Sequence, residues 1–202
     1  MNEPDPVRTT LDYYESNAKA FFENTVSVDM TSLYRPFLDL VPQAGAILDA
    51  GCGSGRDSKY FINNGFKVVA FDYSPELVRL ASEHIGQDVL LLSFDDLNFE
   101  KQFDGVWACA SMLHLPKQKM SVALSKLKNA LKNNGILYAS FKYGDAELYR
   151  NNRYFSDYDE ESFNELLKDH LRFTPIKYWK TSDLRPEREH EKWLNILLRK
   201  EM

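Results

Sequence analysis

Ile47-Leu48-Asp49-Ala50-Gly51-Cys52-Gly53-Ser54-Gly55 is the stretch from which the fold prediction starts. Its apolar beginning is typical of a buried strand, and Arg56 to Asn64 has the apolar spacing of a helix. The three glycines between them predict a turn in which backbone N–H groups approach a ligand without side chains in the way. We therefore expect a strand, a ligand-binding loop and a helix, with Gly51, Cys52, Gly53, Gly55 and Arg56 at the ligand.

The residues around this loop exclude two common nucleotide motifs. A dinucleotide fingerprint counted from Gly51 needs glycine or alanine where Arg56 stands, and a phosphate-binding P-loop needs Gly-Lys-Ser/Thr. Asp49 comes directly before the loop and would be poorly placed beside a pyrophosphate. The pattern favours a ligand that carries positive charge.

A second acid follows the next predicted strand. Lys67 to Phe71 is strand-like and ends on Asp72, roughly 20 residues past the glycines, where an acid that binds ribose hydroxyls is expected. Ser74-Pro75-Glu76 then gives an N-cap, a proline at the first helical position and an acid in the first turn. We expect Asp72, Tyr73 and Ser74 to face the ligand.

Composition restricts the class of protein. The 202 residues normally make one domain, and a net charge of −5 offers no attraction to phosphate backbones or anionic membranes. Cys52 and Cys109 are the only cysteines, and the four histidines have no ligand spacing. We expect a cytoplasmic protein with no disulfide, metal, nucleic-acid partner, signal peptide or membrane span.

Three segments together resemble class I S-adenosylmethionine-dependent methyltransferases: the glycine loop continued by Arg56-Asp57, Val69-Ala-Phe-Asp-Tyr-Ser-Pro75, and Phe103-Asp-Gly-Val-Trp-Ala-Cys-Ala-Ser-Met-Leu-His-Leu-Pro116. Within that superfamily the chain is similar to the small tellurite-resistance-related, methyltransferase type 11-like group. The resemblance implies an α/β, Rossmann-like single domain with a seven-stranded, mostly parallel sheet, an antiparallel last strand and helices on both faces. It also implies S-adenosyl-L-methionine as cofactor and S-adenosyl-L-homocysteine as product.

The same resemblance assigns an N-terminal segment, residues 1–45, as a helical lid on a core of residues 46–202. Residues 1 to 8 are expected to form a loose arm before a helix from Thr10 to Asn24. Tyr14 and Phe21 on that helix would lie over the cofactor and substrate, or would simply pack in the core.

Two further strand ends complete the predicted cofactor site. Val89 to Leu92 reads as a strand buried on both faces. The superfamily's usual adenine-binding aspartate is replaced by Ser93, so Phe94 and Asp95 become the candidates, with ordinary loop charge as the alternative for the acid. Ala110 follows the fourth strand, where the transferred methyl group should point.

His114 is the candidate general base, because an ordinary histidine pKa suits proton abstraction, although such a histidine is commonly structural. Residues 142–158 are too long for a simple connector and begin at a central strand end. They offer Lys142, Glu147, Arg153 and Tyr154 as substrate-binding residues, or as solvated charges. The residues after the fourth strand, Ala110 to His114, lack the Pro-Pro motif of exocyclic-amine methyltransferases.

The last two predicted strands, Phe173 to Thr181 and Lys192 to Arg199, are joined by a short loop and must be antiparallel. The methyltransferase sheet ends this way, with the last strand inserted between the two before it. The sequence favours methylation of a small molecule by in-line displacement. Two alternatives remain: a methyltransferase that acts on tRNA or protein, and a non-catalytic cofactor-binding protein. A nicotinamide oxidoreductase is a third alternative, which is disfavoured because Arg56 replaces the glycine that its dinucleotide motif needs.

Overall fold

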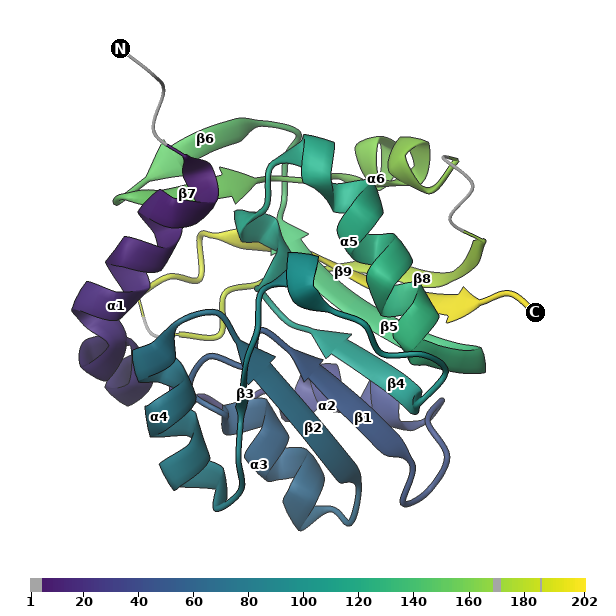
Figure 1. Ribbon diagram of the computed structural model, residues 1–202. Helices are drawn as coiled ribbons and strands as arrows, with labels where there is room; N and C mark the ends of the chain where they lie inside the picture. The colour runs from purple at the N-terminus through teal and green to yellow at the C-terminus, as the bar shows by residue number, and fades with distance from the viewer. Residues whose placement is uncertain (1–4, 169–171, 186) are drawn as a thin grey trace.

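A computed structural model describes residues 5–168, 172–185 and 187–202. Its centre is a seven-stranded sheet with the order β3-β2-β1-β4-β5-β9-β8, in which β9 is antiparallel to both neighbours (Figure 1). The strands are β1 (Ala46–Ala50), β2 (Lys67–Asp72), β3 (Leu90–Leu91), β4 (Phe103–Ala108), β5 (Leu131–Lys142), β8 (Phe173–Ser182) and β9 (Lys192–Lys200). The predicted α/β, Rossmann-like fold is confirmed, including the insertion of the last strand between the two before it.

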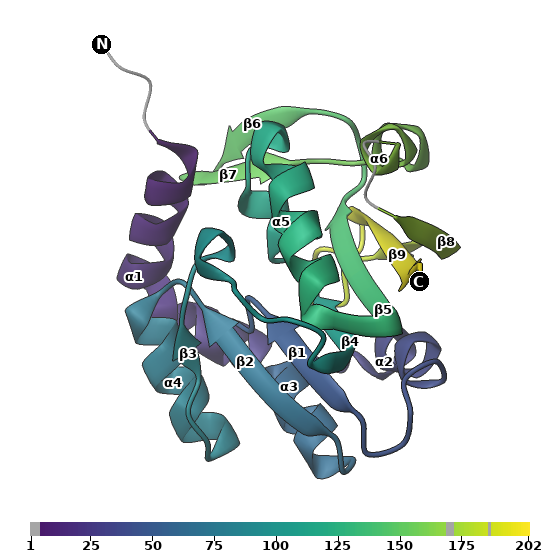
Figure 2. The ribbon, with the colours of Figure 1, turned by 45° about the vertical axis from the view of Figure 1, so that its right-hand side comes forward.

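Helices cover both faces of the sheet (Figure 2). On one face lie α2 (Thr31–Leu38), α3 (Arg56–Asn63) and α4 (Pro75–Ile85); on the other lie α5 (Lys117–Ala130) and α6 (Glu160–Leu167). The long α1 (Pro6–Thr25) instead crosses the edge at which the arrows of β1 and β2 end (Figure 1). Because ligands of open α/β sheets bind beyond the carboxyl ends of the strands, α1 covers the expected binding edge.

Helix-end signals in the sequence work as local physical chemistry predicts. The hydroxyl of Ser74 accepts a hydrogen bond from the backbone N–H of Leu77, and Gly86 ends α4 in the left-handed conformation. The same chemistry corrects the predicted start of α1: Asp5 caps it by accepting from the N–H of Val7. Residues 6–8 are therefore helical rather than part of a loose arm, and residues 1–4 lie outside the described part of the chain.

The prediction that Val89 to Leu92 is buried on both faces was wrong. β3 has only two residues, and the side chains of Leu90 and Leu91 are 38% and 53% exposed. β3 lies at the edge of the sheet, where it pairs with β2. An apolar run by itself does not distinguish a central strand from an edge strand.

Residues 142–158 are not an irregular loop. They contain a two-stranded hairpin, β6 (Glu147–Arg150) and β7 (Arg153–Ser156), outside the main sheet. β7 lies beside the N-terminal half of α1 (Figure 1), and the Tyr154 N–H donates to the hydroxyl of Thr10 (3.0 Å). The hairpin thus holds the helix that covers the binding edge. Within the described ranges, no helix is long and apolar enough to cross a membrane.

Candidate active site

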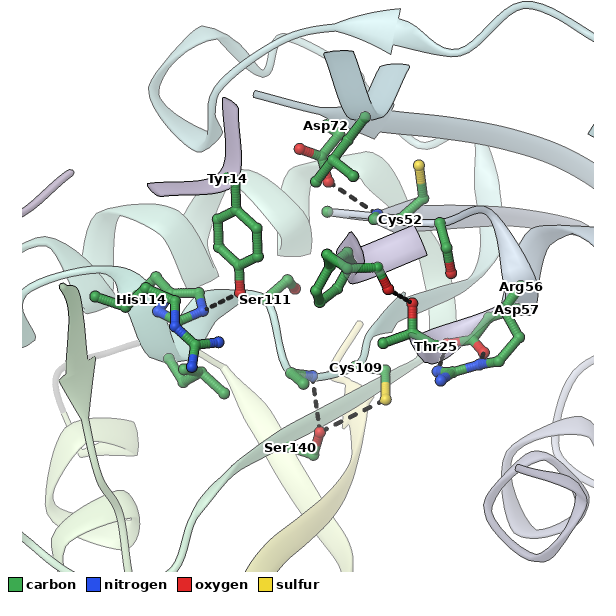
Figure 3. A pocket seen from close by; sticks show the side chains of 18 of the residues that line it. Tyr14, Thr25, Cys52, Arg56, Asp57, Asp72, Cys109, Ser111, His114 and Ser140 are labelled. Atoms are coloured by element: carbon green, nitrogen blue, oxygen red, sulfur yellow. Dashed lines mark hydrogen bonds and ion pairs between the residues drawn. The ribbon is translucent and has the colours of Figure 1, made fainter. Parts of the chain in front are cut away.

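One cavity runs along the carboxyl ends of the strands, beneath α1 (Figure 3). At one end it is lined by the glycine loop after β1, the residues after β2 and the turn after β3; at the other end it is lined by the end of β5, the hairpin and the β8–β9 loop. Of the residues nominated from the sequence, it brings together Tyr14, Phe21, Gly51, Cys52, Gly53, Arg56, Asp72, Tyr73, Ser74, Phe94, Ala110, His114, Lys142 and Arg153. Asp49, Gly55, Asp95, Glu147 and Tyr154 are not among its lining residues.

The glycine loop packs so closely against its neighbours that Gly51 has no room for a side chain. Gly51 has φ 77°, and a Cβ added to it would lie 2.5 Å from the Cβ of Ser111. The N–H groups of Gly51 and Cys52 both donate to the carbonyl of Phe71 (3.0 and 2.9 Å), which ties the loop to β2. Glycine is required at position 51 for both its backbone conformation and its packing.

Asp72 links the loop to the end of β2. Its Oδ2 accepts from the Gly53 N–H (2.9 Å) and its Oδ1 from the Ser74 N–H (3.0 Å). Burial raises the pKa of Asp72, while these two backbone hydrogen bonds act in the opposite direction. Each carboxylate oxygen keeps a further lone pair, and the carboxylate lines the cavity, so it can accept from two hydroxyl groups at once.

Asp49 lies behind the loop, outside the cavity lining. It is 2% exposed, and its Oδ2 accepts from the hydroxyl of Ser58 (2.6 Å). Burial and the neighbouring Asp57 raise the pKa of Asp49 to about 8. Its contacts join β1 to α3 beneath the loop.

Asp57 is a central polar residue that the sequence reading did not nominate. It accepts from the hydroxyl of Tyr34 (2.6 Å), from the Arg56 guanidinium (2.6 and 3.0 Å) and from the indole N–H of Trp107 (2.8 Å). Although burial acts to raise it, the pKa of Asp57 is lowered by Arg56 and these hydrogen bonds. The only sequence signal was an acid in the first turn after the glycine loop; Tyr34 and Trp107 come from distant segments. The network fixes Arg56 at the wall of the cavity.

The turn after β3 lines one end of the cavity. Phe94 lies in the short 3₁₀ helix η1 (Phe94–Asp96), and its ring packs edge-on against Phe71 with centroids 5.4 Å apart. Asp95, the expected replacement acid, instead forms a surface ion pair with Lys119 (2.9 Å; 58% of the Asp95 side chain is exposed). The geometry therefore gives Asp95 no place in the cavity, because η1 turns its side chain outward, and leaves Phe94 as the candidate.

The residues after β4 bend sharply. Ala110 has φ 53°, a conformation that costs a residue with a Cβ roughly 1 kcal/mol or more. Its N–H donates to the hydroxyl of Ser140 (2.9 Å), and the Ser111 hydroxyl donates to the carbonyl of Ala50 (2.5 Å). These bonds to β5 and β1 hold the bend against the cavity.

Tyr14 and His114 meet inside the cavity, with the Tyr14 Oη 2.9 Å from His114 Nε2 (Figure 3). The Nδ1 of His114 lies 2.7 Å from the carbonyl oxygen of Tyr154. A carbonyl only accepts, so Nδ1 carries the proton, and Nε2 must accept from the Tyr14 hydroxyl. Burial lowers the pKa of His114 to about 4; Arg153 acts in the same direction and the Tyr154 carbonyl opposes it. His114 is a neutral imidazole at pH 7, not the ordinary histidine expected from the sequence.

Of the four candidates from residues 142–158, only two lie at the other end of the cavity. Lys142 and Arg153 line the cavity. Glu147 and Tyr154 instead bind each other outside it, through a 2.6 Å hydrogen bond from the tyrosine hydroxyl. The β8–β9 loop adds Arg185 and Arg188, which the sequence did not single out because nothing local ties that loop to the cavity.

Comparison with known proteins agrees with this geometry. A family model described as a methyltransferase domain matches residues 47–135. The Bacillus subtilis (strain 168) protein named as a methyltransferase, YqeM, is 33% identical over 132 residues, covering 60% of this chain and 52% of that protein. The chain spans about half or less of the length of the first curated relatives that it matches.

Two solved structures are similar over nearly the whole chain. The Burkholderia thailandensis 1,6-didemethyltoxoflavin-N1-methyltransferase, solved with 1,6-didemethyltoxoflavin and S-adenosylhomocysteine, has a TM-score of 0.80 at 21% identity and covers 100% of this chain and 93% of its own. The magnesium protoporphyrin IX methyltransferase of Synechocystis PCC 6803, with bound S-adenosylmethionine, has a TM-score of 0.75 at 17% identity, covering 99% and 100%. At these identities the likeness shows the fold.

Residues 47–135, which carry the glycine loop and the ends of β1, β2 and β4, thus match a model of the methyltransferase domain, and the whole chain shares the fold of solved methyltransferases.

Proposed function

We propose that the protein transfers the methyl group of S-adenosylmethionine to a small-molecule acceptor and releases S-adenosylhomocysteine. One observation carries the proposal: the Asp72 carboxylate with its glycine loop, and the Tyr14–His114 pair, line the same cavity. A cofactor held by the first set would present its methyl group toward the second.

In this proposal Asp72 accepts from both ribose hydroxyls, and Tyr73 and Ser74 flank it. The loop from Gly51 to Gly55 carries the methionine part of the cofactor, with Cys52 and Arg56 at its edge. Phe94 contacts the adenine. Asp49 orders the loop from behind through its bond to Ser58. These groups lie at or just after the carboxyl ends of β1, β2 and β3, as binding at the edge of an open α/β sheet requires.

We assign residues 1–45 as a lid over the core of residues 46–202. Three contacts support a closed lid: the Tyr14–His114 bond, the bond from Tyr154 to Thr10, and a bond from the Ser74 hydroxyl to the carboxylate of Glu15. Phe21 packs on the glycine loop, since a Cβ at Gly53 would lie 3.0 Å from its ring. A site covered in this way favours a small acceptor over a folded macromolecule.

The chain's chemical work is to hold two reactants at attack distance and to keep water out. When bound, S-adenosylmethionine would supply a methyl group carried by a sulfonium. A lone pair of the acceptor forms the new bond to the methyl carbon, and the electron pair of the broken carbon–sulfur bond stays on sulfur. The Tyr14 hydroxyl donates a hydrogen bond to Nε2 of His114. In the reaction the Tyr14 oxygen takes the proton of the acceptor atom while the hydroxyl proton of Tyr14 moves to Nε2. His114 thus acts through Tyr14, and a buried imidazole with a low pKa takes the proton only as the acceptor loses it.

Several observations favour a small acceptor and a cytoplasmic protein. The net charge of −5 does not favour nucleic acid, and the structures of similar fold were solved with small molecules. Cys52 and Cys109 are free thiols, which suits a reducing compartment. The tellurite-resistance-related grouping stays a prediction from the sequence.

Incubation of the purified protein with methyl-tritiated S-adenosylmethionine tests the proposal. We expect label to appear in at least one member of a panel of small phenols, carboxylates, thiols and amines, with release of S-adenosylhomocysteine. Label found only in added tRNA or protein would establish a macromolecular methyltransferase instead. Cofactor binding without transfer to either class would favour a non-catalytic binding protein.

A further inference from the structure

Five cationic side chains line the cavity, and four of them already have a carboxylate partner. The pairs are Arg56 with Asp57, Lys142 with Asp183 and Glu191, Arg185 with Asp183, and Arg188 with Glu191. The fifth is Arg153. No carboxylate in the described part of the chain lies within ion-pair distance of its guanidinium.

One donor of the Arg153 guanidinium lacks a hydrogen bond, although the guanidinium also acts on the Tyr14 hydroxyl through a hydrogen bond. Its Nε is buried and has no hydrogen-bond partner among the described residues. Aromatic rings surround it instead: the guanidinium carbon lies 4.6 Å from the ring centre of Tyr13, 5.3 Å from Phe155 and 5.9 Å from Tyr14. Aromatic faces stabilise a cation but accept no conventional hydrogen bond. The Nε of Arg153 therefore loses its hydrogen bond to water on burial and gains no protein acceptor among the described residues in its place.

Arg153 lies next to the reacting end of the cavity. It is the first residue of β7, and the carbonyl of the following residue, Tyr154, fixes His114. Arg153 also lines a neighbouring hollow with Tyr13, Arg185 and Arg188, which opens beside the main cavity. An anion bound to Arg153 would therefore hold the rest of an acceptor close to the Tyr14–His114 pair.

The charge of this end of the cavity contrasts with that of the whole protein. Lys142, Arg153, Arg185 and Arg188 are four cations, whereas the carboxylates paired with them are two, Asp183 and Glu191. Two positive charges are thus left over locally in a protein whose net charge is −5. A local surplus of this kind inside a cleft attracts anions and repels cations.

We propose that the methyl acceptor carries an oxyanion, a carboxylate or a phosphate, which is bound by Arg153. The inference rests on the proposed function and adds the chemical class of the acceptor. The planar guanidinium binds either group through two parallel hydrogen bonds, and a bound oxygen satisfies the orphaned Nε. The surrounding rings of Tyr14 and Phe155 fit an acceptor whose anionic group is attached to an aromatic or other apolar body.

Calorimetric titration of the protein saturated with S-adenosylhomocysteine tests the proposal. The probes are benzoate, phenyl phosphate and the neutral benzamide, each added to wild type, Arg153→Met, Arg153→Lys and Arg79→Gln. Arg79 lies on α4, away from the cavity lining, with 51% of its side chain exposed, and Arg79→Gln removes the same charge. Equal affinity of all variants for S-adenosylhomocysteine shows that the cofactor site is intact in each.

We expect benzoate or phenyl phosphate to bind at least tenfold more tightly than benzamide, and the stronger of the two identifies the kind of oxyanion. Arg153→Met should remove this preference, Arg153→Lys should retain part of it, and Arg79→Gln should leave it unchanged. A wild type that binds S-adenosylhomocysteine but does not prefer either anion over benzamide would overturn the inference alone. So would a preference that survives in Arg153→Met. Failure to bind S-adenosylhomocysteine would overturn the proposed function, and the inference with it.

Discussion

The hydroxyl of Tyr14, on the helix that covers the cavity, donates to Nε2 of His114, on the turn after β4, across 2.9 Å. The two residues are 100 positions apart in the sequence. The bond therefore joins the helix that covers the cavity to the turn after β4, and the proposed proton path passes through this contact.

Tyr14→Phe tests this contact. The substitution keeps the ring but removes the proton path and leaves His114 Nε2 without its donor, so we expect turnover to fall about 10²-fold with no change in affinity for S-adenosylhomocysteine. The measurement is methyl transfer to the acceptor found by the labelling screen. Tyr13→Phe is the control, since it keeps the ring that lies against Arg153. Unchanged turnover in Tyr14→Phe would show that the hydroxyl plays no part in the reaction.

His114 should make stability depend on pH. Its pKa is about 4 in the folded protein and near 6.5 in the unfolded chain, so between these values the unfolded chain binds more protons. The free energy of unfolding should therefore decrease as pH falls from about 6.5 to about 4, by about 3 kcal/mol in total from this residue. Urea unfolding at several pH values measures it.

The matched variants are His114→Gln, which cannot titrate, and His190→Gln, which removes an exposed histidine. His114→Gln should lose most of this pH dependence and His190→Gln should keep it. Identical slopes in the two variants would contradict the buried, neutral state of His114.

Gly51 and Gly86 form a natural pair for testing the glycine loop. Both have φ 77°, but a Cβ at Gly86 meets nothing within 4 Å, whereas one at Gly51 meets Ser111 at 2.5 Å. Gly86→Ala should cost about 1 kcal/mol of stability through backbone strain alone and leave cofactor affinity unchanged. Gly51→Ala should cost about 3 kcal/mol and weaken S-adenosylhomocysteine binding at least tenfold, because the loop must shift. Equal effects in urea unfolding and calorimetry would mean that the loop tolerates a side chain.

Asp57→Asn tests the buried network behind the loop. It removes the charge that compensates Arg56, whose side chain is only 18% exposed, so we expect a loss of about 3 kcal/mol in the free energy of unfolding. Asp12→Asn removes one partner of the surface pair with Arg8 and should cause no measurable change. A stable Asp57→Asn protein would show that water reaches Arg56.

Local signals explain why so much of the fold could be predicted from the sequence. The glycine loop, the Ser74 cap and Gly86 each act within a few residues, and the short connection between the last strands forces them to be antiparallel. The glycine and acid signals were also located correctly, because each follows the end of a strand.

What the sequence could not predict depends on contacts between distant segments. Burial of a strand depends on its place in the sheet, so the apolar sequence of β3 led to a wrong prediction of burial on both faces. Asp57 receives hydrogen bonds from Tyr34 and Trp107, residues that only the fold brings together. The difference between Lys142, which is paired with carboxylates from the β8–β9 loop, and Arg153, which is not, likewise exists only in three dimensions.

The most direct test of the central claim is calorimetric titration of S-adenosylhomocysteine into wild type, Asp72→Ala and Asp95→Asn, with NAD as a control ligand. We predict micromolar binding by wild type and Asp95→Asn, no binding of NAD, and a loss of at least about 100-fold in Asp72→Ala, where two hydrogen bonds to the ribose disappear. Circular dichroism checks that Asp72→Ala is folded. Undiminished affinity in a folded Asp72→Ala protein, or binding of NAD in place of S-adenosylhomocysteine by wild type, would contradict the account.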